Sequence, residues 1–468
     1  MMKQNRTMPK GKLTATQYRR RKVQKVLGIL LKIVLVLSMI LFVWITDLGC
    51  AFGWIKNAKA GENWPPSFVG YGEMMIAASV LLTAGAVLVF LRRNWISLGV
   101  GTVGIVLCLI PMFRVTAYAA DSGELRGVWF SYLDWQNMPT DEAGFKAAAD
   151  QVMSDIQKNG MNAIFCHVHS HSDAYYPSSV LPTSKFLPGN GSFDALQYMI
   201  DSAHRHGLSF HAWFNPYRVT GYQMKWSDVP AGSVVKQWYA SGSRNVLLFD
   251  GNYYLNPAQP AVRDLVVSSI REVLTKYAID GVQFDDYFYP DLGKDAATNF
   301  DYPEYQLYSG SASITEWRKA NVSALIAAVY QTVHAVRPSA VFGVSPVGPL
   351  RNLRSEKSYF VDIDTWMSHT GYIDYVLPQI YFDFEQKTGS GAASDAAYAT
   401  CLSSWLQLQQ KTGGKVKLYV GLALYKCGTN SWDGNAKPEW LRRSDILLRE
   451  VQLARQSGQV SGFGIYAY

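Results

Sequence analysis

The stretch Asp280–Pro290, D-G-V-Q-F-D-D-Y-F-Y-P, begins as an apolar β-strand and ends in two adjacent carboxylates among aromatic residues. Val282 and Phe284 alternate with more polar neighbours, which is the two-residue period of a strand with one apolar face. An apolar strand seldom ends in paired acids unless the strand end has a role. The stretch therefore predicts a buried strand whose carboxyl end, at Asp285 and Asp286, belongs to a functional site.

Short apolar runs of this kind alternate with amphipathic helical stretches along the rest of the chain. The expected strands are 125–131, 162–168, 208–214, 281–287, 341–347, 374–382, 417–424 and 461–467. The expected helices are 141–159, 193–206, 260–277, 314–336, 394–411 and 440–456. Alternating strands and helices in this number predict a (β/α)8 TIM barrel over residues 121–468. A doubly wound open sheet is the alternative, but it normally uses fewer strands.

Strand parity decides which of the two acids faces the barrel axis. Alternate residues of a barrel strand point inward and outward, and active sites lie at the carboxyl ends of the strands. Because Val282 and Phe284 are apolar and face the helices, Gln283 and Asp285 point inward. Asp285 is therefore the better catalytic candidate, while Asp286 falls on the other parity or in the loop, where it orients the loop. A register shift at the strand end exchanges the two roles.

The same parity gives the barrel mouth a mixed polar and aromatic lining. The residues expected there are Trp129, His167, His169, Trp213, Asn215, Asp285, Gln379, Tyr381, Asp383 and Tyr466. Aromatic faces stack on the C–H faces of sugar rings, amides and carboxylates bind hydroxyl groups, and two carboxyl groups cleave a glycosidic bond. The lining therefore favours a sugar substrate and a hydrolase that needs no cofactor.

Structural roles compete with these interpretations. An aspartate at a strand end often caps or braces a loop, so Asp285 taken alone is equally a structural residue. Its place in a barrel turns the interpretation toward catalysis. The aromatic residues from Tyr287 to Tyr289 either pack the loop or serve as sugar platforms, and Asp383 lies either at the mouth or in solvent.

A second polar motif, H-V-H-S-H-S-D, follows the strand 162–168. His167, His169 and His171 alternate along one strand face, and Asp173 follows them. This spacing is able to hold Zn²⁺ or another divalent ion, provided that distant strands supply further ligands. Histidine clusters also bind substrate directly. A metal site is therefore an alternative to the carboxylate interpretation, and we expect no metal in the leading one.

The first 120 residues differ in charge from the rest of the chain. Residues 1–32 carry ten Lys/Arg and no acid, and residues 33–120 carry five basic and three acidic residues, which leaves a net charge of −4 for residues 121–468. The overall charge of +8 is thus a property of the N-terminal region and gives no reason to expect a nucleic-acid partner. The five cysteines are scattered without disulfide or metal spacing, so we expect free thiols.

Three apolar runs, 26–45, 74–91 and 95–113, approach the roughly 20 residues needed to cross a bilayer. Basic clusters before the first run and between the second and third are expected to stay inside. We therefore expect a basic cytoplasmic tail (1–25), a membrane anchor of about three helices (26–113) and a barrel domain outside the cytoplasm of a bacterial cell. Residues 92–120 also resemble a cleavable signal peptide, but two preceding spans favour retention.

Nine motifs, in order along the chain, resemble those of the bacterial glycosyl-hydrolase-like family 10 proteins. They are L-R-G-V-W-F-S (125–131), D-A-Y-Y-P-S (173–178), H-A-W-F-N-P-Y-R (211–218), Y-L-N-P (254–257), D-G-V-Q-F-D-D-Y-F-Y-P (280–290), W-R-K-A-N-V (317–322), F-G-V-S-P-V-G (342–348), P-Q-I-Y (378–381) and G-F-G-I-Y-A-Y (462–468). The resemblance implies a TIM barrel related to glycoside hydrolases. In at least one branch of the family, it implies action on peptidoglycan glycan strands, preferably those stripped of stem peptides.

The resemblance also implies residue roles. The strand 281–287 looks like the amylase-type pattern, in which the acid that closes the strand is the nucleophile, and this match falls on Asp285. The strand 341–347 supplies no glutamate as general acid, so Asp383, Glu385 and Glu304 are the candidates, of which we choose Asp383, with Asp286 as a further catalytic residue. Parity and motifs together give the expected sugar-binding residues as Trp129, His169, Asp173, Trp213, Asn215, Tyr217, Arg218, Gln379, Tyr381 and Tyr466.

Three hypotheses follow. The first is a membrane-tethered glycoside hydrolase that acts outside the cytoplasm on cell-wall, peptidoglycan-type glycan or a related polysaccharide. The second is a glycan-binding barrel without catalysis, which the missing acid in 341–347 motivates. The third is a metal-dependent hydrolase or deacetylase that uses His167, His169 and His171.

Overall fold

The computed structural model describes residues 123–468, which belong to one compact unit. The expected cytoplasmic tail (1–25) and the three expected membrane spans (26–45, 74–91 and 95–113) lie outside the described residues. Within the described part of the chain, no helix combines the length and apolar character that a membrane crossing requires. The fold is therefore reported for the expected barrel domain.

Eight parallel strands close into a barrel in the order β1-β10-β9-β8-β7-β6-β3-β2. They are β1 (Leu125–Phe130), β2 (Ala163–His169), β3 (Ser209–Phe214), β6 (Gly281–Phe284), β7 (Val341–Val344), β8 (Tyr375–Val376), β9 (Lys417–Ala423) and β10 (Val460–Tyr466). β10 closes the ring by pairing in parallel with β1. The predicted TIM barrel is confirmed, and the open doubly wound sheet is wrong because the sheet has no free edge.

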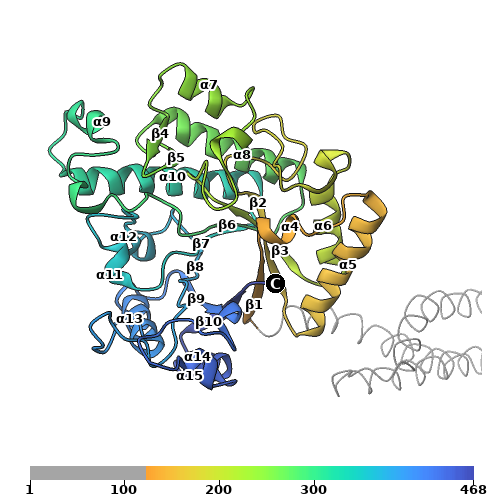
Figure 1. Cartoon of the computed structure of the whole chain (residues 1–468), viewed down its shortest axis with the longest axis vertical. Helices are drawn as coiled ribbons and strands as arrows, with labels where there is room; N and C mark the ends of the chain where they lie inside the picture. The colour runs from red at the N-terminus through yellow and green to blue at the C-terminus, as the bar shows by residue number, and fades with distance from the viewer. Residues whose placement is uncertain (1–122) are drawn as a thin grey trace, which may run out of the picture. The chain divides into compact units, whose positions relative to one another are not determined.

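Helices surround the strands on the outside, as Figure 1 shows. The six long helices match the expected ones and are α5 (Glu142–Lys158), α6 (Ala195–Arg205), α8 (Pro260–Lys276), α10 (Ile314–Val336), α13 (Tyr398–Lys411) and α15 (Ile446–Gln456). Short helices occupy the connections, namely α4 (Tyr132–Trp135), α7 (Val234–Ala240), α9 (Tyr302–Gln306), α11 (Leu350–Leu353), α12 (Ile363–Ser368) and α14 (Glu439–Arg442). Side-chain caps fix several starts, as where Asp141 accepts the N–H of Gly144 at 2.8 Å.

An additional hairpin interrupts the repeat between β3 and α8. It consists of β4 (Val246–Phe249) and β5 (Asn252–Leu255), which pair antiparallel across a turn at Asp250 and Gly251. Both turn residues have positive φ, which a two-residue hairpin turn requires. A backbone bridge between Arg218 and Tyr254 joins the hairpin to the loop after β3. The hairpin therefore fixes the segment that carries Arg218.

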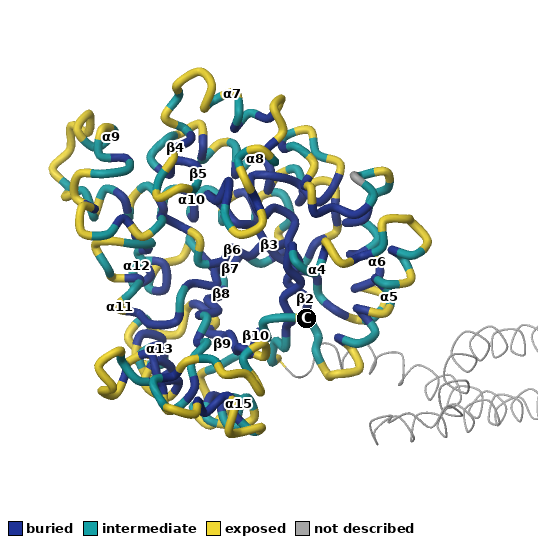
Figure 2. Tube along the Cα trace, viewed as in Figure 1, coloured by how far each residue is buried: buried dark blue, intermediate teal, exposed yellow. Residues whose placement is uncertain are grey.

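The two largest hydrophobic cores of the described residues lie on opposite sides of the strands and confirm the predicted strand parity. The larger core lies between the strands and the helices and contains the outward residues of each strand, such as Phe210, Val282 and Phe284. The smaller core fills the barrel interior and consists of Trp129, Phe165, Trp213, Tyr375, Leu377 and Tyr419. Figure 2 shows the strands as buried and the outer loops as exposed.

Glycines make room for the large side chains of the interior core. A Cβ added to Gly127 would lie 2.3 Å from the ring of Phe165, and one added to Gly343 would lie 2.2 Å from the ring of Tyr375. Only a glycine fits at these inward positions because packed interiors leave no space for a methyl group. Small and large residues on neighbouring strands thus complement each other across the barrel.

Three barrel strands, β6, β7 and β8, are shorter than the sequence suggests, and in β7 and β8 proline interrupts the ladder. β7 ends at Val344 and β8 at Val376, whereas the expected strands ran to 347 and 382. Pro346 and Pro378 follow these ends, and proline has no N–H to donate to a ladder. Isolated bridges at Gln379, to Val347 and to Gly421, continue the parallel pairing beyond the breaks. The chain around Gln379 therefore stays in the barrel wall.

Candidate active site

Asp285 lies at the carboxyl end of β6 and points into the barrel, as strand parity predicts. Its side chain is 2% exposed. Trp213 Nε1 donates to Asp285 Oδ2 at 2.9 Å, and Asn215 Nδ2 donates to the same oxygen at 3.2 Å. The backbone N–H of Tyr287 donates to Oδ1 at 3.2 Å. Three donors thus hold this carboxyl group in one orientation.

Asp286 lies beside Asp285 at the mouth, which favours the second of its two expected roles, a further catalytic residue, over that of a loop-orienting residue. β6 ends at Phe284, so the alternation of a strand no longer applies to the two acids. The Asp286 side chain is half-buried and accepts a hydrogen bond from Gln379, and its charge acts on Asp285. The two carboxyl groups therefore form an interacting pair at the mouth.

Burial is the main cause of the raised pKa values of this pair. It raises the pKa of Asp285 to about 7, with the negative charge of Asp286 adding to the effect and the positive charge of Arg218 opposing it. Burial also raises the pKa of Asp286, against the opposing effect of its hydrogen bonds, including the one from Gln379. Two neighbouring carboxyl groups, of which one titrates near pH 7, are able to divide the roles of acid and base between them.

Arg218 supplies positive charge at the same mouth. The residue is 7% exposed, and its guanidinium lies 4.3 Å from the ring centre of Tyr287 and 5.5 Å from that of Tyr132. Its charge lowers the pKa values of both Asp285 and Asp286. The expected sugar-binding residues Trp213, Asn215 and Gln379 therefore lie with Arg218 around one pair of acids.

An aromatic wall, formed by Tyr381, Tyr466 and Tyr425, lies beside this pair of acids. The rings of Tyr381 and Tyr466 stack at 6.0 Å, and Trp129 meets Tyr466 edge-on at 6.2 Å. Tyr425, which is 52% exposed, contacts Tyr381 and Tyr466 edge-on. The charges of Asp285 and Asp286 raise the pKa of Tyr381, although burial is the larger cause. These contacts place Tyr381 near the acids, so the wall offers flat apolar faces next to the carboxyl groups.

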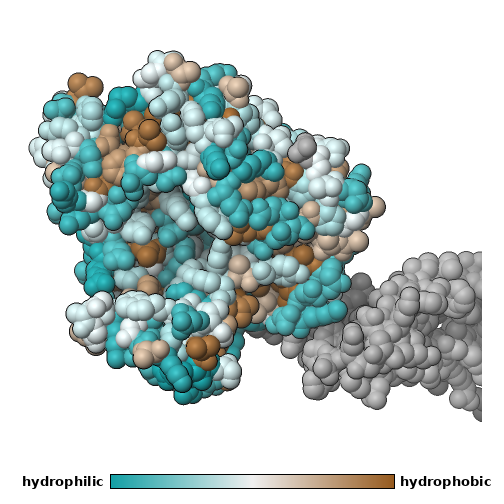
Figure 3. Space-filling model, viewed as in Figure 1, coloured by the Kyte–Doolittle hydropathy of each residue, from teal (hydrophilic) through white to brown (hydrophobic). Residues whose placement is uncertain are grey.

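The surface over the barrel is hollowed. On the face drawn in Figure 3, the hollow lies near the middle of the domain, over the strands that Figure 1 labels there, and its walls are of mixed polarity. Sugar-binding sites combine apolar ring faces with polar groups in this way, because a sugar presents C–H faces and hydroxyl edges.

The three histidines do not gather around one point, so the alternative of a metal site gains no support from the described residues. Within residues 123–468, no group of three His, Cys, Asp or Glu side chains is arranged to hold a metal ion. The pairing of β2 with β3 shifts between His167 and His169, and β2 ends at His169, so His171 lies in the loop. His167 stacks on Trp213 with ring centres 3.3 Å apart. The alternation that the sequence suggests is lost at the strand end.

The histidines are instead buried neutral side chains. Burial lowers the pKa of His169 to about 4 and that of His171 to about 2, and it holds the pKa of His167 well below its ordinary value. Each of them has one ring nitrogen without a hydrogen-bond partner. Asp173 accepts the backbone N–H groups of Ser170 and His171 through one oxygen, which fixes the loop.

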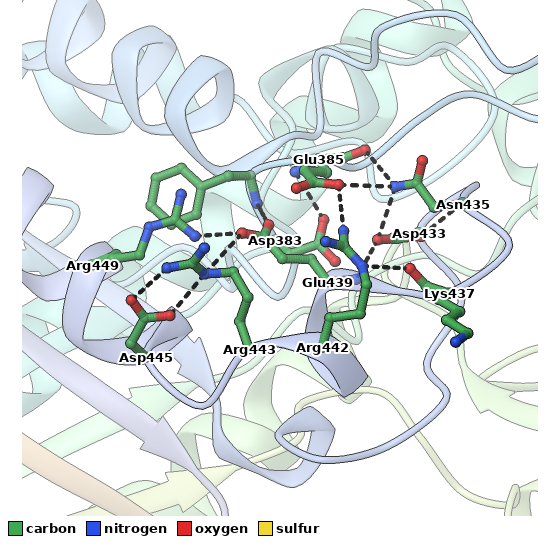
Figure 4. Close-up of polar contacts among 11 residues, drawn as sticks. Asp383, Glu385, Asp433, Asn435, Lys437, Glu439, Arg442, Arg443, Asp445 and Arg449 are labelled. Atoms are coloured by element: carbon green, nitrogen blue, oxygen red, sulfur yellow. Dashed lines mark hydrogen bonds and ion pairs between the residues drawn. The ribbon is translucent and has the colours of Figure 1, made fainter.

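Asp383 belongs to a different acidic cluster, drawn in Figure 4. Burial and the neighbouring Asp433 raise the pKa of Asp383 to about 7, and the two carboxyl groups share a hydrogen bond. Glu439 lies close to both, since its backbone N–H donates to Asp433 at 2.7 Å and its carboxylate accepts from Phe384 N at 2.9 Å. The contacts of Asp383 therefore join two loops, 383–387 and 433–439, and none of them is with Asp285.

Comparisons with known proteins give the family of the chain. The family model of glycosyl hydrolase-like 10 matches residues 124–441. The chain belongs to this family. It is 32% identical over 375 residues to the glycosyl hydrolase DigH of Escherichia coli (strain K12), covering 73% of this chain and 82% of that protein. It is 33% identical over 370 residues to the glycosyl hydrolase YngK of Bacillus subtilis (strain 168), covering 73% of this chain and 68% of that protein.

A solved structure shares the fold. The glycoside hydrolase domain of PgaB (BpsB) from Bordetella bronchiseptica superposes with a TM-score of 0.51 at 15% sequence identity, over 73% of this chain and 94% of that domain. At this identity the likeness concerns the barrel alone. It agrees with the closed eight-stranded sheet described above.

The other candidates for the general acid are engaged elsewhere in this family member. Glu304 forms an ion pair with Arg244 and accepts hydrogen bonds from Asn256 and Gln259. Glu385 is exposed and pairs with Arg442. Both acids therefore serve contacts between surface segments.

Sequence reasoning misplaced the sugar-binding candidate Tyr217, left the role of Tyr287 open and missed two aromatic residues, Tyr132 and Tyr425. Tyr217 is 2% exposed and packs in the outer core rather than at the mouth. Tyr132 and Tyr287 flank Arg218, and Tyr425 joins the aromatic wall. Tyr287 stands 48% exposed, so it belongs to the mouth, whereas Tyr289 packs the loop. Tyr132 and Tyr425 follow β1 and β9, and their position after strand ends is the signal that could have identified them.

Proposed function

We propose that this protein is a membrane-tethered glycoside hydrolase whose barrel acts outside the cytoplasm on cell-wall, peptidoglycan-type glycan. The observation that carries the proposal is the pair of interacting carboxyl groups, Asp285 and Asp286, at the end of β6. Glycosidases use two carboxyl groups and a positively polarised sugar transition state. Family membership and the names of the relatives in Escherichia coli and Bacillus subtilis support hydrolysis of a glycosidic bond.

Asp285 acts as nucleophile or base. Its carboxyl group is fixed by donors from Trp213, Asn215 and the backbone of Tyr287, and the bonds from Trp213 and Tyr287 oppose the rise of its pKa that burial causes. A fixed carboxylate at a strand end presents its free lone pairs toward the sugar or toward an attacking water. The amylase-type resemblance of this strand assigns the same role.

Asp286 acts as the general acid, in preference to Asp383. It is half-buried, it neighbours Asp285 and burial raises its pKa, so it holds a proton to a higher pH than an ordinary aspartate. A proton donor with a raised pKa matches the need to protonate the leaving oxygen near neutral pH. Asp383, the choice made from sequence, has its carboxyl group tied to Asp433.

The remaining residues of the mouth position the sugar. Tyr381, Tyr466 and Tyr425 offer ring faces to the C–H side of a pyranose, and the buried Trp129 supports Tyr466 from the barrel interior. Gln379 interacts with Asp286 and donates to the backbone of Ser345 at 2.9 Å, so its amide is held at the edge of the mouth.

The location rests on the N-terminal sequence. Three apolar runs of membrane-spanning length, with basic clusters on the side expected to be cytoplasmic, support a location of the barrel outside the bacterial membrane. A tethered barrel at this position meets wall glycan directly. The net charge of −4 in residues 121–468 gives no support for a nucleic-acid partner.

The test uses the full-length protein in detergent. Wild type and Asp285→Asn are incubated with purified glycan strands, with and without stem peptides, and new reducing ends are identified by mass spectrometry. We expect wild type to cut the strands and the variant to leave them intact, and the masses of the product ends identify the bond. If neither protein cuts but both bind the strands, the barrel is a glycan-binding module and the proposal is wrong.

A further inference from the structure

Arg218 is held rigidly although its charge is not neutralised. Its backbone N–H donates to Asn215 Oδ1 at 3.1 Å, and its backbone carbonyl accepts from Ser172 Oγ at 3.2 Å. Its Nε donates to the carbonyl of Ser170 at 3.1 Å. The guanidinium also lies against the rings of Tyr132 and Tyr287. Backbone, side-chain and ring contacts therefore fix the direction in which the end of the side chain points.

The two terminal nitrogens of Arg218 are nevertheless without partners. Among the described residues, no carboxylate forms an ion pair with Arg218, and its Nε is the one side-chain donor with a hydrogen bond. Neither of these terminal nitrogens is fully buried, so both keep access to solvent at the mouth. The free edge of the guanidinium is thus open toward a ligand.

Arg318, the fully buried arginine of α10, has a structural role and serves as a comparison for Arg218. Its Nε donates to Asp301 Oδ1 at 2.7 Å, and its other nitrogens donate to the carbonyls of Ala296 and Asn299 at 2.6 and 3.0 Å. Removing a guanidinium from water is costly unless its charge and its donors are satisfied. Arg318 is satisfied on all sides, whereas Arg218 keeps one side free beside the acids.

Two groups of neighbours set the electrostatic surroundings of Arg218. The adjacent His167, His169 and His171 are neutral at pH 7, because burial and the charge of Arg218 itself disfavour their protonation. Asp285 and Asp286 feel the charge of Arg218 without contacting it as an ion pair, and Asp285 still titrates near pH 7. Arg218 is therefore not the counter-ion that keeps Asp285 ionised.

We propose that Arg218 binds a carboxylate carried by the substrate sugar, so that the barrel selects an acidic glycan. The planar edge of a guanidinium matches a carboxylate in two parallel hydrogen bonds. A single positive charge beside two acids suits a singly charged group better than a dianionic phosphate, which those acids would repel. The free lactyl group of muramic acid and the C6 carboxylate of a uronic acid both supply this chemistry. The proposal rests on the proposed hydrolase function and adds the charge of the substrate to it.

The experiment compares substrates that differ in one charge. Full-length protein in detergent is given peptide-free peptidoglycan strands, in which each muramic acid keeps its lactyl carboxylate, and the same strands after carbodiimide coupling to methylamine, which makes that group a neutral amide. A uronic-acid glycan serves as the second carboxylate source. The readout is kcat/KM for each substrate, with kcat and KM determined separately. We expect wild type to prefer the free carboxylate by about 30-fold or more, mainly through KM, as for other arginine–carboxylate contacts.

Variants assign this preference to one residue. In Arg218→Gln, the ratio of kcat/KM between free and amidated strands is expected to fall toward one, and Arg218→Lys, which keeps the charge without the planar edge, is expected to give an intermediate ratio. Arg455→Gln is the matched control, since Arg455 is an exposed arginine paired with Glu124, just before the start of β1 at the other end of the barrel. It is expected to keep the wild-type ratio.

Each outcome decides the inference. The inference is overturned if wild type cuts free and amidated strands equally well. It is also overturned if Arg218→Gln loses activity equally on both substrates and shifts the pH profile, because Arg218 then acts through Asp285. Preference for the uronic-acid glycan supports the inference with a different source of carboxylate. If wild type cuts nothing, the proposed hydrolase function fails, and calorimetric binding of free against amidated strands decides the inference separately. If Arg218→Gln does not fold, by near-ultraviolet circular dichroism, the wild-type comparison and Arg218→Lys decide it.

Discussion

The mouth pair, Asp285 and Asp286, and the second acidic cluster, around Asp383, share one electrostatic property and differ in everything around it. In both regions burial and a neighbouring acid raise a carboxyl pKa to about 7. In the second cluster the nearby cations are paired, since Arg449 and Arg443 both form ion pairs with Glu439. At the mouth, Arg218 is unpaired and exposed ring faces lie beside the acids.

The difference teaches that a shifted pKa does not by itself identify an active site. Burial of any acid network raises pKa values, whether the network serves chemistry or joins two loops. What distinguishes the mouth is that some of its groups are free to bind a ligand, namely the terminal N–H donors of Arg218 and the exposed rings of Tyr287 and Tyr425. The arginines of the second cluster are paired internally, as Figure 4 shows: Arg449 pairs with Glu439, Arg443 with Asp445 and Arg442 with Glu385. Four predictions test this distinction.

The largest effect is expected for Asp285→Asn. The amide keeps the shape of the side chain but removes the nucleophile or base, so kcat should fall by about 10³-fold or more. Steady-state kinetics on wall glycan measure this loss. Binding of the strands, followed by calorimetry, should persist because the aromatic wall and Arg218 are untouched. A variant that keeps more than a tenth of the wild-type kcat would show that Asp285 takes no part in the chemical step.

Asp286→Asn is expected to lower kcat by about 10²- to 10⁴-fold, the usual contribution of a general acid. It should also change the pH dependence of the residual activity. Because the charge of Asp286 adds to the rise in the pKa of Asp285, removing that charge lowers the pKa of Asp285. The acidic limb of kcat/KM against pH, where Asp285 becomes protonated, should therefore move to lower pH. An unmoved limb would show that the two groups are not coupled.

Trp213→Phe removes one donor to Asp285 and keeps most of the ring. The bond from Nε1 stabilises the ionised carboxylate, and a hydrogen bond to a charged group contributes about 1.5–3 kcal/mol, so kcat/KM should fall about 10- to 100-fold. The acidic limb should move to higher pH, opposite to the shift in Asp286→Asn. An acidic limb that does not move in Trp213→Phe would mean that Trp213 acts through packing alone. Trp226→Phe, a tryptophan stacked on Tyr253 outside the barrel, is the matched control.

Strand periodicity was enough to predict the barrel, the six long helices and the inward direction of Asp285. It failed where strands end. Alternation stops at Phe284 and His169, so the orientation of Asp286 and the spread of the histidines depend on loop geometry. The β4–β5 hairpin had a local signal in Asp250-Gly251, a pair typical of tight turns.

Contacts between distant segments set the rest of the site, and a single sequence does not encode them visibly. Asp383 followed the inward parity of its expected strand, yet β8 ends at Val376 and the chain then turns toward Asp433. Tyr132 meets Arg218 across two loops. In both cases the partner lies many residues away, and only the closed barrel brings the two together.

The smallest effect on activity is expected for Asp383→Asn, which is instead expected to change stability. The folded pKa of Asp383 is raised to about 7, above that of an unfolded aspartate, so the folded chain keeps its proton between about pH 4 and 7 while the unfolded chain has lost it. This group therefore makes the fold less stable as pH rises from 4 to 7, by roughly 2–4 kcal/mol. Asparagine has no proton to lose, and its amide can still donate to Asp433.

Thermal unfolding of the full-length protein at pH 5 and pH 8 measures this change. Asp383→Asn should unfold at the wild-type temperature at pH 5 and a few degrees above wild type at pH 8, with kcat within about threefold of wild type. Asp285→Asn should show the same stabilisation at pH 8, because its pKa is raised to the same value, but no activity. The two substitutions thus separate electrostatic strain, which both regions have, from catalysis, which we assign to the mouth alone. Loss of activity in Asp383→Asn as large as in Asp285→Asn would instead make Asp383 the general acid, and the distinction between the two regions would fail.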